Sequence, residues 1–198
     1  METDYLNYDA CLETARQFHG EVCGGIMIGT RMSIVGMKSV GILDPKGKDR
    51  KNLMIFVEID RCATDAILAV TGCHPGKRTM KIMDYGKMAA TFINLKTGKA
   101  VRVAAKNRDG DKVITREMME KNPHTPDYYS VKTDEELFDV HEVSVTLKPE
   151  DLPGRPVRSV VCSSCGERVM DAKELVKDDK TICRTCAGTT TYYSKTGK

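Results

Sequence analysis

The chain has 198 residues, 40% of them hydrophobic, and its 31 Lys and Arg against 28 Asp and Glu give a formal net charge of +3. This length allows one domain of ordinary size plus a small appendage. A net charge so small does not indicate a nucleic-acid-binding protein. No apolar run approaches membrane-spanning length, and acids occupy the N-terminal positions where an export signal carries Lys or Arg. We therefore expect a cytoplasmic protein with no membrane partner.

Two helices are expected in the first 40 residues. Apolar side chains at helical spacing over residues 4–19 predict an amphipathic helix. Residues 24–40 are rich in Gly, Met and Ile and predict a buried helix, in which Gly25 and Gly29 lie four apart. Because glycine lowers helix stability, its presence there indicates that another backbone approaches closely.

The middle of the chain mixes strand and helix patterns. Residues 53–59 are β-branched and aromatic and predict a central strand. Residues 63–70 predict a helix that ends at Gly72. Similar patterns predict strands at 79–83, 89–95, 100–105 and 140–147 and short helices at 115–121 and 133–138. This mixture favours the α+β class, with N-terminal helices packed on a mainly antiparallel sheet.

A Pro-rich segment, residues 149–156, follows the last expected strand. It holds three prolines and one glycine, and each proline disfavours helix at the residue before it, so the segment is expected to be an extended linker. The chain then divides into a first domain of residues 1–148, the linker, and a small C-terminal domain of residues 157–198.

The C-terminal domain contains two Cys-x-x-Cys pairs, Cys162 with Cys165 and Cys183 with Cys186, separated by seventeen residues. Two such pairs are typical of a tetrahedral zinc site, because each tight turn presents two thiolates. Four protein ligands leave no open coordination position, so the zinc is expected to be structural. It would hold together a zinc ribbon too small to fold by apolar burial alone.

The basic excess of the protein lies in this ribbon. Residues 155–198 hold nine Lys and Arg and five Asp and Glu, a difference of +4. With Tyr192 and Tyr193 available for stacking, a nucleic-acid-binding or transcription-associated function is therefore the alternative interpretation. Zinc ribbons also dock proteins, so the fold alone does not decide, and a nucleic-acid partner is the less favoured interpretation.

Four further cysteines and all four histidines lie in the first domain. His19 and Cys23 lie where the two first helices meet, Cys62 lies where a strand becomes a helix, and Cys73 follows the end of that helix. Chain segments of this kind often converge on one cleft. Free cysteines are also common core residues, however, so spacing alone does not decide between a metal site and packing.

Four motifs in this domain resemble a known family. They are the stretches His19–Gly25, Arg61–Ile67, Thr71–Lys77 and Asp84–Lys87. In this order they are similar to the FmdE component of formylmethanofuran dehydrogenase, a family whose members often carry a C-terminal zinc ribbon. The resemblance covers residues 10–147.

The resemblance implies a cytoplasmic α+β metal-binding protein that is often a homodimer. It implies His19, Cys23, Cys62 and Cys73 as ligands of a second metal, zinc or another transition metal. The family is named for an oxidoreductase with a molybdenum or tungsten centre in other subunits. An accessory role to such an enzyme is therefore one expectation, and a stand-alone metalloprotein that binds a small ligand is the other. Catalysis by this chain alone is not established by the resemblance.

Three residues depart from the family pattern, in which the motifs usually read His-Gly-His and Cys-Pro-Gly and a later position is commonly Thr; Gly24 replaces the proline. Here Glu21 replaces the second histidine and His74 replaces the threonine. If the second histidine is a ligand in relatives, Glu21 would supply an oxygen in place of a nitrogen, which favours a harder metal. His74 would either add a nitrogen ligand or merely replace a hydroxyl.

Three further residues and one pairing have alternative interpretations. Asp65 and Glu58 are candidates to orient His19, or they are ordinary surface or capping carboxylates. Cys11 lies on the apolar face of the first helix and is expected to pack in the core. Cys62 and Cys73 would be a redox pair under a third, less favoured interpretation.

Overall fold

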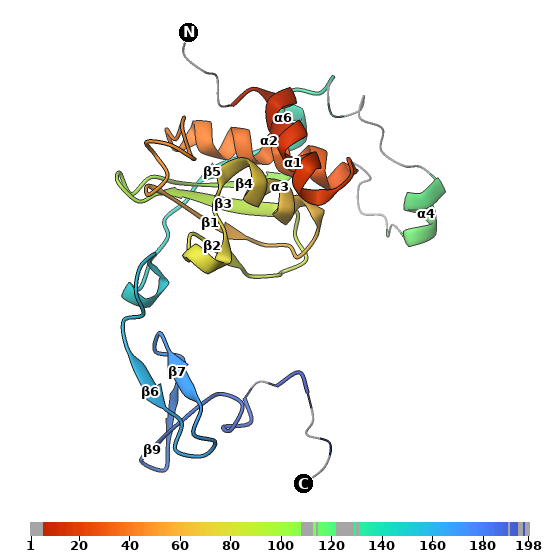
Figure 1. Ribbon diagram of the computed structural model, residues 1–198. Helices are drawn as coiled ribbons and strands as arrows, with labels where there is room; N and C mark the ends of the chain where they lie inside the picture. Colours follow the sequence, from red (N-terminus) through yellow and green to blue (C-terminus); the bar gives the residue numbers. More distant parts are fainter. Residues whose placement is uncertain are drawn as a thin grey trace. The chain divides into compact units, whose positions relative to one another are not determined.

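The computed structural model describes two compact units, residues 1–146 and residues 147–198. Each unit is described by itself (Figure 1). The described residues are 6–107, 113, 115–121, 129, 131–189, 191–193 and 196. Within them, no helix has the length and apolar character needed to cross a membrane.

Three helices form the first layer of the first unit: α1 (Tyr8–His19), α2 (Gly24–Ser39) and α3 (Cys62–Thr71). Helix α1 begins four residues later than the spacing predicts. The reason is local: the Asn7 side chain accepts a hydrogen bond from the Ala10 amide at 3.1 Å and caps the helix there. The predicted buried helix is confirmed, because eleven of the sixteen residues of α2 are buried.

A five-stranded sheet forms the second layer, in the order β2, β1, β3, β4, β5. Strands β1 and β2 are parallel and the other neighbours are antiparallel. The strands are β1 (Leu53–Val57), β2 (Met80–Ile82), β3 (Ala89–Asn94), β4 (Ala100–Ala105) and β5 (Phe138–Glu142). The fold is therefore α+β with a mainly antiparallel sheet, and Figure 1 shows α1, α2 and α3 together on one side of it.

The last strand differs from its prediction: it covers Phe138–Glu142 instead of residues 140–147. It ends early because its partner does: Val143 donates its amide to Ala100, the first residue of β4, at 3.0 Å. Among the described residues of the first unit, short helices also lie at α4 (Arg116–Lys121), α6 (Asp134–Leu137) and the 3-10 turn η1 (Pro75–Lys77).

The core of the first unit lies between the helices and the sheet. Phe92 of β3 is fully buried, and a Cβ added at Gly36 of α2 would lie 2.2 Å from its ring. Helix α2 therefore lies directly on the sheet, with only a glycine between its backbone and an aromatic ring. Cys11 is 6% exposed and belongs to this core, as its place on the apolar face of α1 predicts.

The second unit consists of two small antiparallel hairpins, β6 (Ser159–Val161) with β7 (Arg168–Met170) and β8 (Leu175–Lys177) with β9 (Lys180–Ile182). The Pro-rich segment before them is not extended throughout, because Pro149–Asp151 form a 3-10 turn, η2. In that turn Pro149 takes the first position, where its missing N–H leaves no bond unmade. Few side chains in this unit are buried among the residues that the structure describes, so apolar packing contributes little to its stability.

Candidate metal centres

The four cysteines of the second unit form one cluster. One ligand atom from each of Cys162, Cys165, Cys183 and Cys186 lies within 4.8 Å of the others. The first pair follows β6 and the second pair follows β9, and these two strands contact each other. Four sulfurs at this separation can close around a tetrahedral ion with small movements, which is the donor set that structural zinc prefers.

Backbone amides prepare this ribbon cluster for anionic sulfur. The amide of Cys183 donates to Cys162 Sγ at 3.2 Å, and that of Cys186 donates to Cys183 Sγ at 3.3 Å. Amides of Cys165 and Cys183 lower the pKa of the Cys162 thiol to about 6. Such amide bonds stabilise the thiolate, the form that binds metal.

A second cluster lies in the first unit, where one ligand atom from each of His19, Cys23 and Cys62 lies within 4.8 Å of the others. His19 is the last residue of α1, and Gly20 follows it with a φ of 102°, which turns the chain. Cys23 is then the N-cap residue of α2. Cys62 opens α3, just past the carboxyl end of β1. We call this set the first-unit cluster.

The N-termini of α2 and α3 both face the first-unit cluster, since Cys23 caps one helix and Cys62 begins the other. The positive ends of helix dipoles favour negative charge, which suits two thiolates that bind a metal ion at the helix starts. This arrangement requires that the helices approach closely. A Cβ added at Gly25 would lie 2.9 Å from Cys62 Cβ, and one added at Gly29 would lie 2.8 Å from the Ala63 backbone. The predicted close approach at both glycines is confirmed.

His19 is oriented by a carboxylate: its Nδ1 lies 2.8 Å from Asp65 Oδ2. This contact leaves the other ring nitrogen, Nε2, to face a ligand. A carboxylate paired with a metal-binding histidine fixes the tautomer and the ring orientation. Asp65 is therefore the positioning residue, one of the two interpretations that the sequence left open. The exposed fractions of the side chains, 18% for His19 and 43% for Asp65, show that the cluster lies near the surface.

Cys62 needs a cation before it ionises readily. Burial, and next to it the Cys23 thiol, raise the pKa of the Cys62 thiol. A metal ion reverses this effect, because it favours the deprotonated sulfur. A pair of half-buried thiols with an oriented imidazole is thus a donor set suited to zinc or a similar transition metal.

The structure does not bring Cys73 into the first-unit cluster, so the expected set of four ligands is not assembled. Cys73 lies past the far end of α3, whose ten residues span about 15 Å at the helical rise of 1.5 Å per residue. Its side chain is buried, its Sγ lies 3.6 Å from the Leu53 carbonyl oxygen, and burial raises the pKa of its thiol to about 11. The same separation contradicts the interpretation of Cys62 and Cys73 as a redox pair.

Three other candidate residues, Glu58, Glu21 and His74, do not belong to the first-unit cluster. Glu58 makes two hydrogen bonds to Arg102, from Nε at 2.6 Å and Nη2 at 2.7 Å, so it does not orient His19. Glu21 and His74 are both described by the structure and neither is in the cluster. The pairing of Glu58 with Arg102 depends on strand register. Glu58 directly follows the end of β1, Arg102 lies on β4, and β3 lies between these two strands. No spacing in the sequence indicates it.

Comparison with known families gives one match for each unit. Residues 18–150 match the family described as "FmdE, Molybdenum formylmethanofuran dehydrogenase operon". The chain belongs to the FmdE family. Residues 155–192 match the prokaryotic dksA/traR C4-type zinc finger. The protein is thus an FmdE-family metal-binding protein with a C4 zinc-finger unit, as the motifs predict.

Two individual proteins are similar to this FmdE-family chain. A protein of Archaeoglobus fulgidus named "Probable S-adenosyl-L-methionine-binding protein" is 27% identical over 204 residues, which cover 93% of this chain and 54% of that protein. The chain therefore spans about half the length of this curated relative. The crystal structure of a tungsten formylmethanofuran dehydrogenase FmdE-like protein from Syntrophus aciditrophicus has a TM-score of 0.57 and 23% identity, with 94% of this chain and 95% of that chain covered. It confirms the fold.

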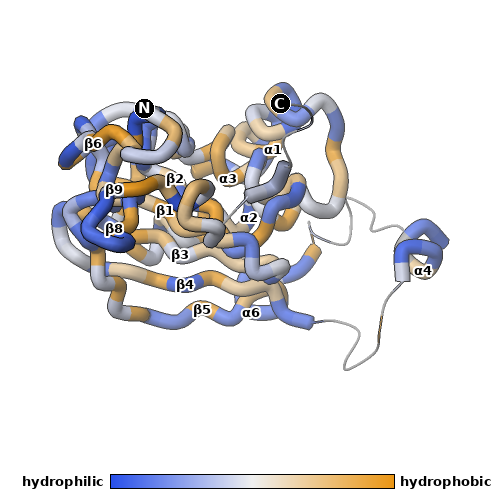
Figure 2. Tube along the Cα trace, turned by 90° about the horizontal axis from the view of Figure 1, so that it is seen from below, coloured by the Kyte–Doolittle hydropathy of each residue, from blue (hydrophilic) through white to orange (hydrophobic). Residues whose placement is uncertain are grey.

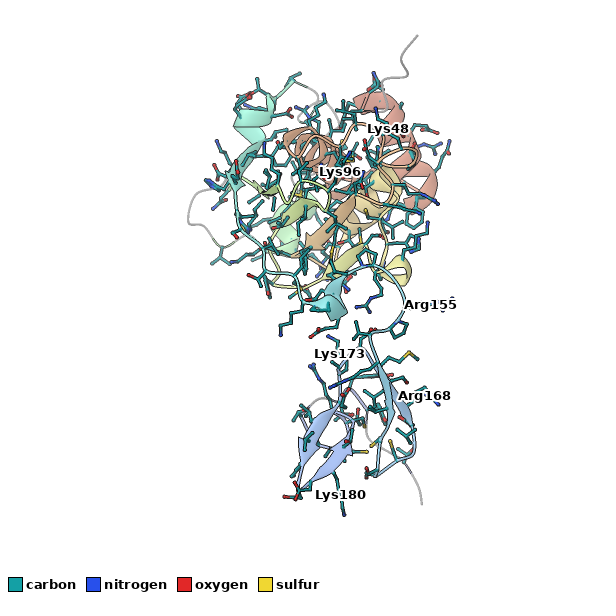
Figure 3. All side chains as sticks on the ribbon, turned by 90° about the vertical axis from the view of Figure 1, so that its left-hand side faces the viewer. Lys48, Lys96, Arg155, Arg168, Lys173 and Lys180 are labelled. Carbon is teal, nitrogen blue, oxygen red and sulfur yellow. The ribbon has the colours of Figure 1, made fainter. Side chains whose placement is uncertain are left out.

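Acidic residues lie among the cations of the zinc-finger unit in the sequence. Figure 3 shows Arg155, Arg168, Lys173 and Lys180 at separate places along this unit, and Lys180 is the first residue of β9. Asp178 and Asp179 directly precede Lys180 in the chain, so acids are interspersed with the bases. The nucleic-acid alternative is not favoured.

Proposed function

We propose that the first unit binds one transition-metal ion through His19, Cys23 and Cys62, and that it uses a remaining coordination position to bind a small ligand. The observation that carries this proposal is the number of ligands. Three protein donors, two thiolates and an imidazole, are the set found in zinc sites that keep a position for water or substrate, whereas four donors close a site. The zinc finger, with four cysteines, is the closed and structural site.

Several features of the first-unit cluster support this role. It lies near the surface, where a ligand has access. His19 is held by Asp65 at 2.8 Å, and both thiols lie at helix N-termini. When bound, the metal would supply Lewis acidity or a site for an anionic donor. The residues of the chain hold the ion, fix the imidazole and compensate the charge of the sulfurs.

The physiological setting of this FmdE-family protein is the second part of the proposal. The family description and the Syntrophus aciditrophicus relative both refer to formylmethanofuran dehydrogenase. We place the chain in the cytoplasm, as an accessory to a molybdenum or tungsten oxidoreductase. Copurification from native extract of a molybdenum- or tungsten-containing complex with this chain supports that role. A chain that purifies alone under mild conditions favours the stand-alone alternative.

Counting metal ions by elemental analysis tests the site. The purified protein should contain two equivalents, and Cys62→Ser should contain one, because the zinc finger keeps its own ion. Cys73→Ser is the matched control: it removes a buried thiol from the same helix region but should leave both equivalents. Two equivalents in Cys62→Ser, or a loss in Cys73→Ser equal to that in Cys62→Ser, would contradict the proposed ligand set.

The name of the Archaeoglobus fulgidus relative supplies a first small ligand to test. S-adenosyl-L-methionine has an amino group and a carboxylate that can occupy an open metal position. Calorimetric titration of the metal-loaded protein should detect binding, and Cys62→Ser should abolish it. Binding that persists unchanged in Cys62→Ser would place this ligand away from the cluster.

A further inference from the structure

Three loops meet at the end of the first-unit sheet where β1 begins, whereas Cys62 follows the opposite end of that strand. The loops are residues 41–52, which lead into β1, residues 72–79, which lead into β2, and residues 95–99, which join β3 to β4. The Leu95 amide donates to the Asn52 carbonyl at 2.7 Å, and Cys73 Sγ lies 3.6 Å from the Leu53 carbonyl oxygen. Figure 2 shows β1, β3 and β4 side by side, so the loops at this end of the strands are neighbours.

These loops concentrate the positive charge of the first unit. They hold eight Lys and Arg against two Asp and Glu, a difference of +6, whereas the rest of residues 1–146 holds 13 against 19, a difference of −6. Figure 1 shows loops 41–52 and 95–99 on its left-hand side, and Figure 3, which faces that side, labels Lys48 and Lys96 there. The seven exposed cations, which we call the basic surface, are Lys46, Lys48, Arg50 and Lys51 on the first loop, Lys77 on the second, and Lys96 and Lys99 on the third.

The two acids of these loops do not pair with the basic surface. Asp44 accepts the Gly47 amide at 2.9 Å and the Lys48 amide at 3.0 Å. Asp49 accepts the amides of Leu43 and Asp44, both at 3.2 Å. Both carboxylates thus fold the first loop. Within the part of the chain that the structure describes, no cation of the basic surface forms an ion pair.

Side-chain contacts hold the loops in place. Asn94 donates from Nδ2 to the Val40 carbonyl at 2.9 Å, and its Oδ1 accepts the Lys96 amide at 3.0 Å, so it joins the start of the first loop to the third. The stem of Lys46 lies over the second loop, since a Cβ added at Gly72 would be 3.3 Å from Lys46 Cγ. Like charges held together in this way raise the local potential, which attracts an anionic partner.

We propose that the basic surface docks an acidic surface of another protein. The zinc-finger unit of this chain does not supply the complement, because residues 147–198 hold ten Lys and Arg against seven Asp and Glu. Exposed charges of this kind act mainly by steering the encounter, so the complex forms fast and weakens as salt is added.

Two features of the loops favour a protein partner over a nucleic acid. The loops contain no Phe, Tyr or Trp, the side chains on which unpaired bases stack. Leu43, on the first loop, is 55% exposed. An apolar contact with charged groups around it is the usual anatomy of a protein interface, whereas a phosphate backbone offers Leu43 no apolar partner.

Charge reversal tests whether this surface binds. Fluorescence anisotropy of a labelled copolymer of glutamate and leucine, titrated with the full-length zinc-loaded protein, measures the Kd. The double variant Lys48→Glu with Lys96→Glu should raise the Kd about tenfold at low salt and reduce its dependence on salt. Lys173→Glu with Lys180→Glu is the matched control, because it changes the net charge equally on the zinc-finger unit, and it should bind like wild type. Equal losses in both variants would overturn the proposal.

Leu43→Ser and other polyanions test the class of partner. The copolymer should bind wild type more tightly than poly-L-glutamate does, and Leu43→Ser should remove that difference. At physiological ionic strength the copolymer should also bind more tightly than duplex DNA or vesicles containing phosphatidylglycerol. Tighter binding of the DNA would assign the surface to a nucleic acid, and tighter binding of the vesicles to a membrane.

A second copy of the chain is the remaining occupant to test, since the rest of the first unit is acidic. Light scattering at low and high salt measures self-association. The proposal expects the Lys48→Glu with Lys96→Glu variant to have the same mass as wild type at both. Salt-sensitive self-association that this variant abolishes would overturn the proposal, as would either of the two reassignments above. None of these measurements depends on the metal proposed for the first unit.

Discussion

At the scale of single residues, Glu58 shows how a charged side chain is accepted inside a sheet. Its side chain is 11% exposed and that of Arg102 is 29% exposed, and two short hydrogen bonds join them. The Arg102 guanidinium lowers the pKa of the Glu58 carboxyl below its ordinary value of 4.5. Since a bidentate pair satisfies both carboxylate oxygens, the carboxylate is stabilised as a charge.

This pair makes a pH-dependent contribution to stability. A carboxyl whose folded pKa is lowered stabilises the protein above its unfolded pKa, and the contribution is lost as the pH falls through the folded value. We expect Glu58→Gln to lower the free energy of unfolding by about 2 kcal/mol at pH 7. The difference from wild type should shrink below the ordinary pKa of 4.5. Urea denaturation of both proteins at pH 7 and at a pH below 4.5 measures this difference in the free energy of unfolding. A difference that does not change with pH would show that the charge of Glu58 is not the cause.

At the scale of elements, the approach of α2 to α3 positions the first-unit cluster. Gly25 lies beside Cys62, and Gly29 lies against the backbone of Ala63. Cys23 and Cys62 cap or begin these two helices, so the distance between the helix starts sets the distance between the sulfurs. A small change in packing at one glycine therefore changes the geometry of the cluster.

Alanine at these glycines should separate packing from metal binding. Gly29→Ala meets backbone atoms at 2.8 Å and should lower the free energy of unfolding by about 1–3 kcal/mol, as overpacking does. Gly25→Ala should also weaken the binding of metal by the first-unit cluster. The loss is detected as one missing equivalent of metal after dialysis against a weak chelator. Ser39→Ala, at the far end of α2, is the control and should change neither property. A Gly25→Ala protein that keeps both equivalents would contradict this role.

At the scale of the whole molecule, the two units have different sources of stability. The first unit has a core of helices on a sheet. The second has two hairpins of three-residue strands and, in its described part, few buried side chains, among them Cys162 and Ile182. A unit of this size gains its folding free energy mainly from bound zinc.

Removing metal should therefore unfold the second unit and leave the first folded. With a strong chelator, amides of residues 159–182 should lose protection in hydrogen exchange, while those of α2 and β3 should keep it. Readdition of zinc should restore the protection, whereas magnesium, a hard cation that prefers oxygen ligands, should not. Protection of β6 to β9 that survives complete removal of metal would contradict this division.

Local patterns in the sequence were enough to predict the buried α2, the strands β3 and β4, the α+β class and the zinc-finger cysteines. These depend on residues close together in the chain: helical spacing, β-branched runs and two Cys-x-x-Cys turns. The motifs also pointed to His19, Cys23 and Cys62, each next to a helix end. Helix ends are readable from sequence, because capping residues and glycines mark them.

Only the tertiary structure decided which of these residues meet. Cys73 lies outside the first-unit cluster, because the length of α3 separates it from Cys62. Asp65, and not Glu58, contacts the His19 ring. Strand β5 ended at Glu142 because β4 offers no partner beyond Ala100. Contacts of this kind depend on strand register and on the packing of helices that are distant in sequence. Neither quantity has a local signature, so the sequence alone identified the candidates and the fold chose among them.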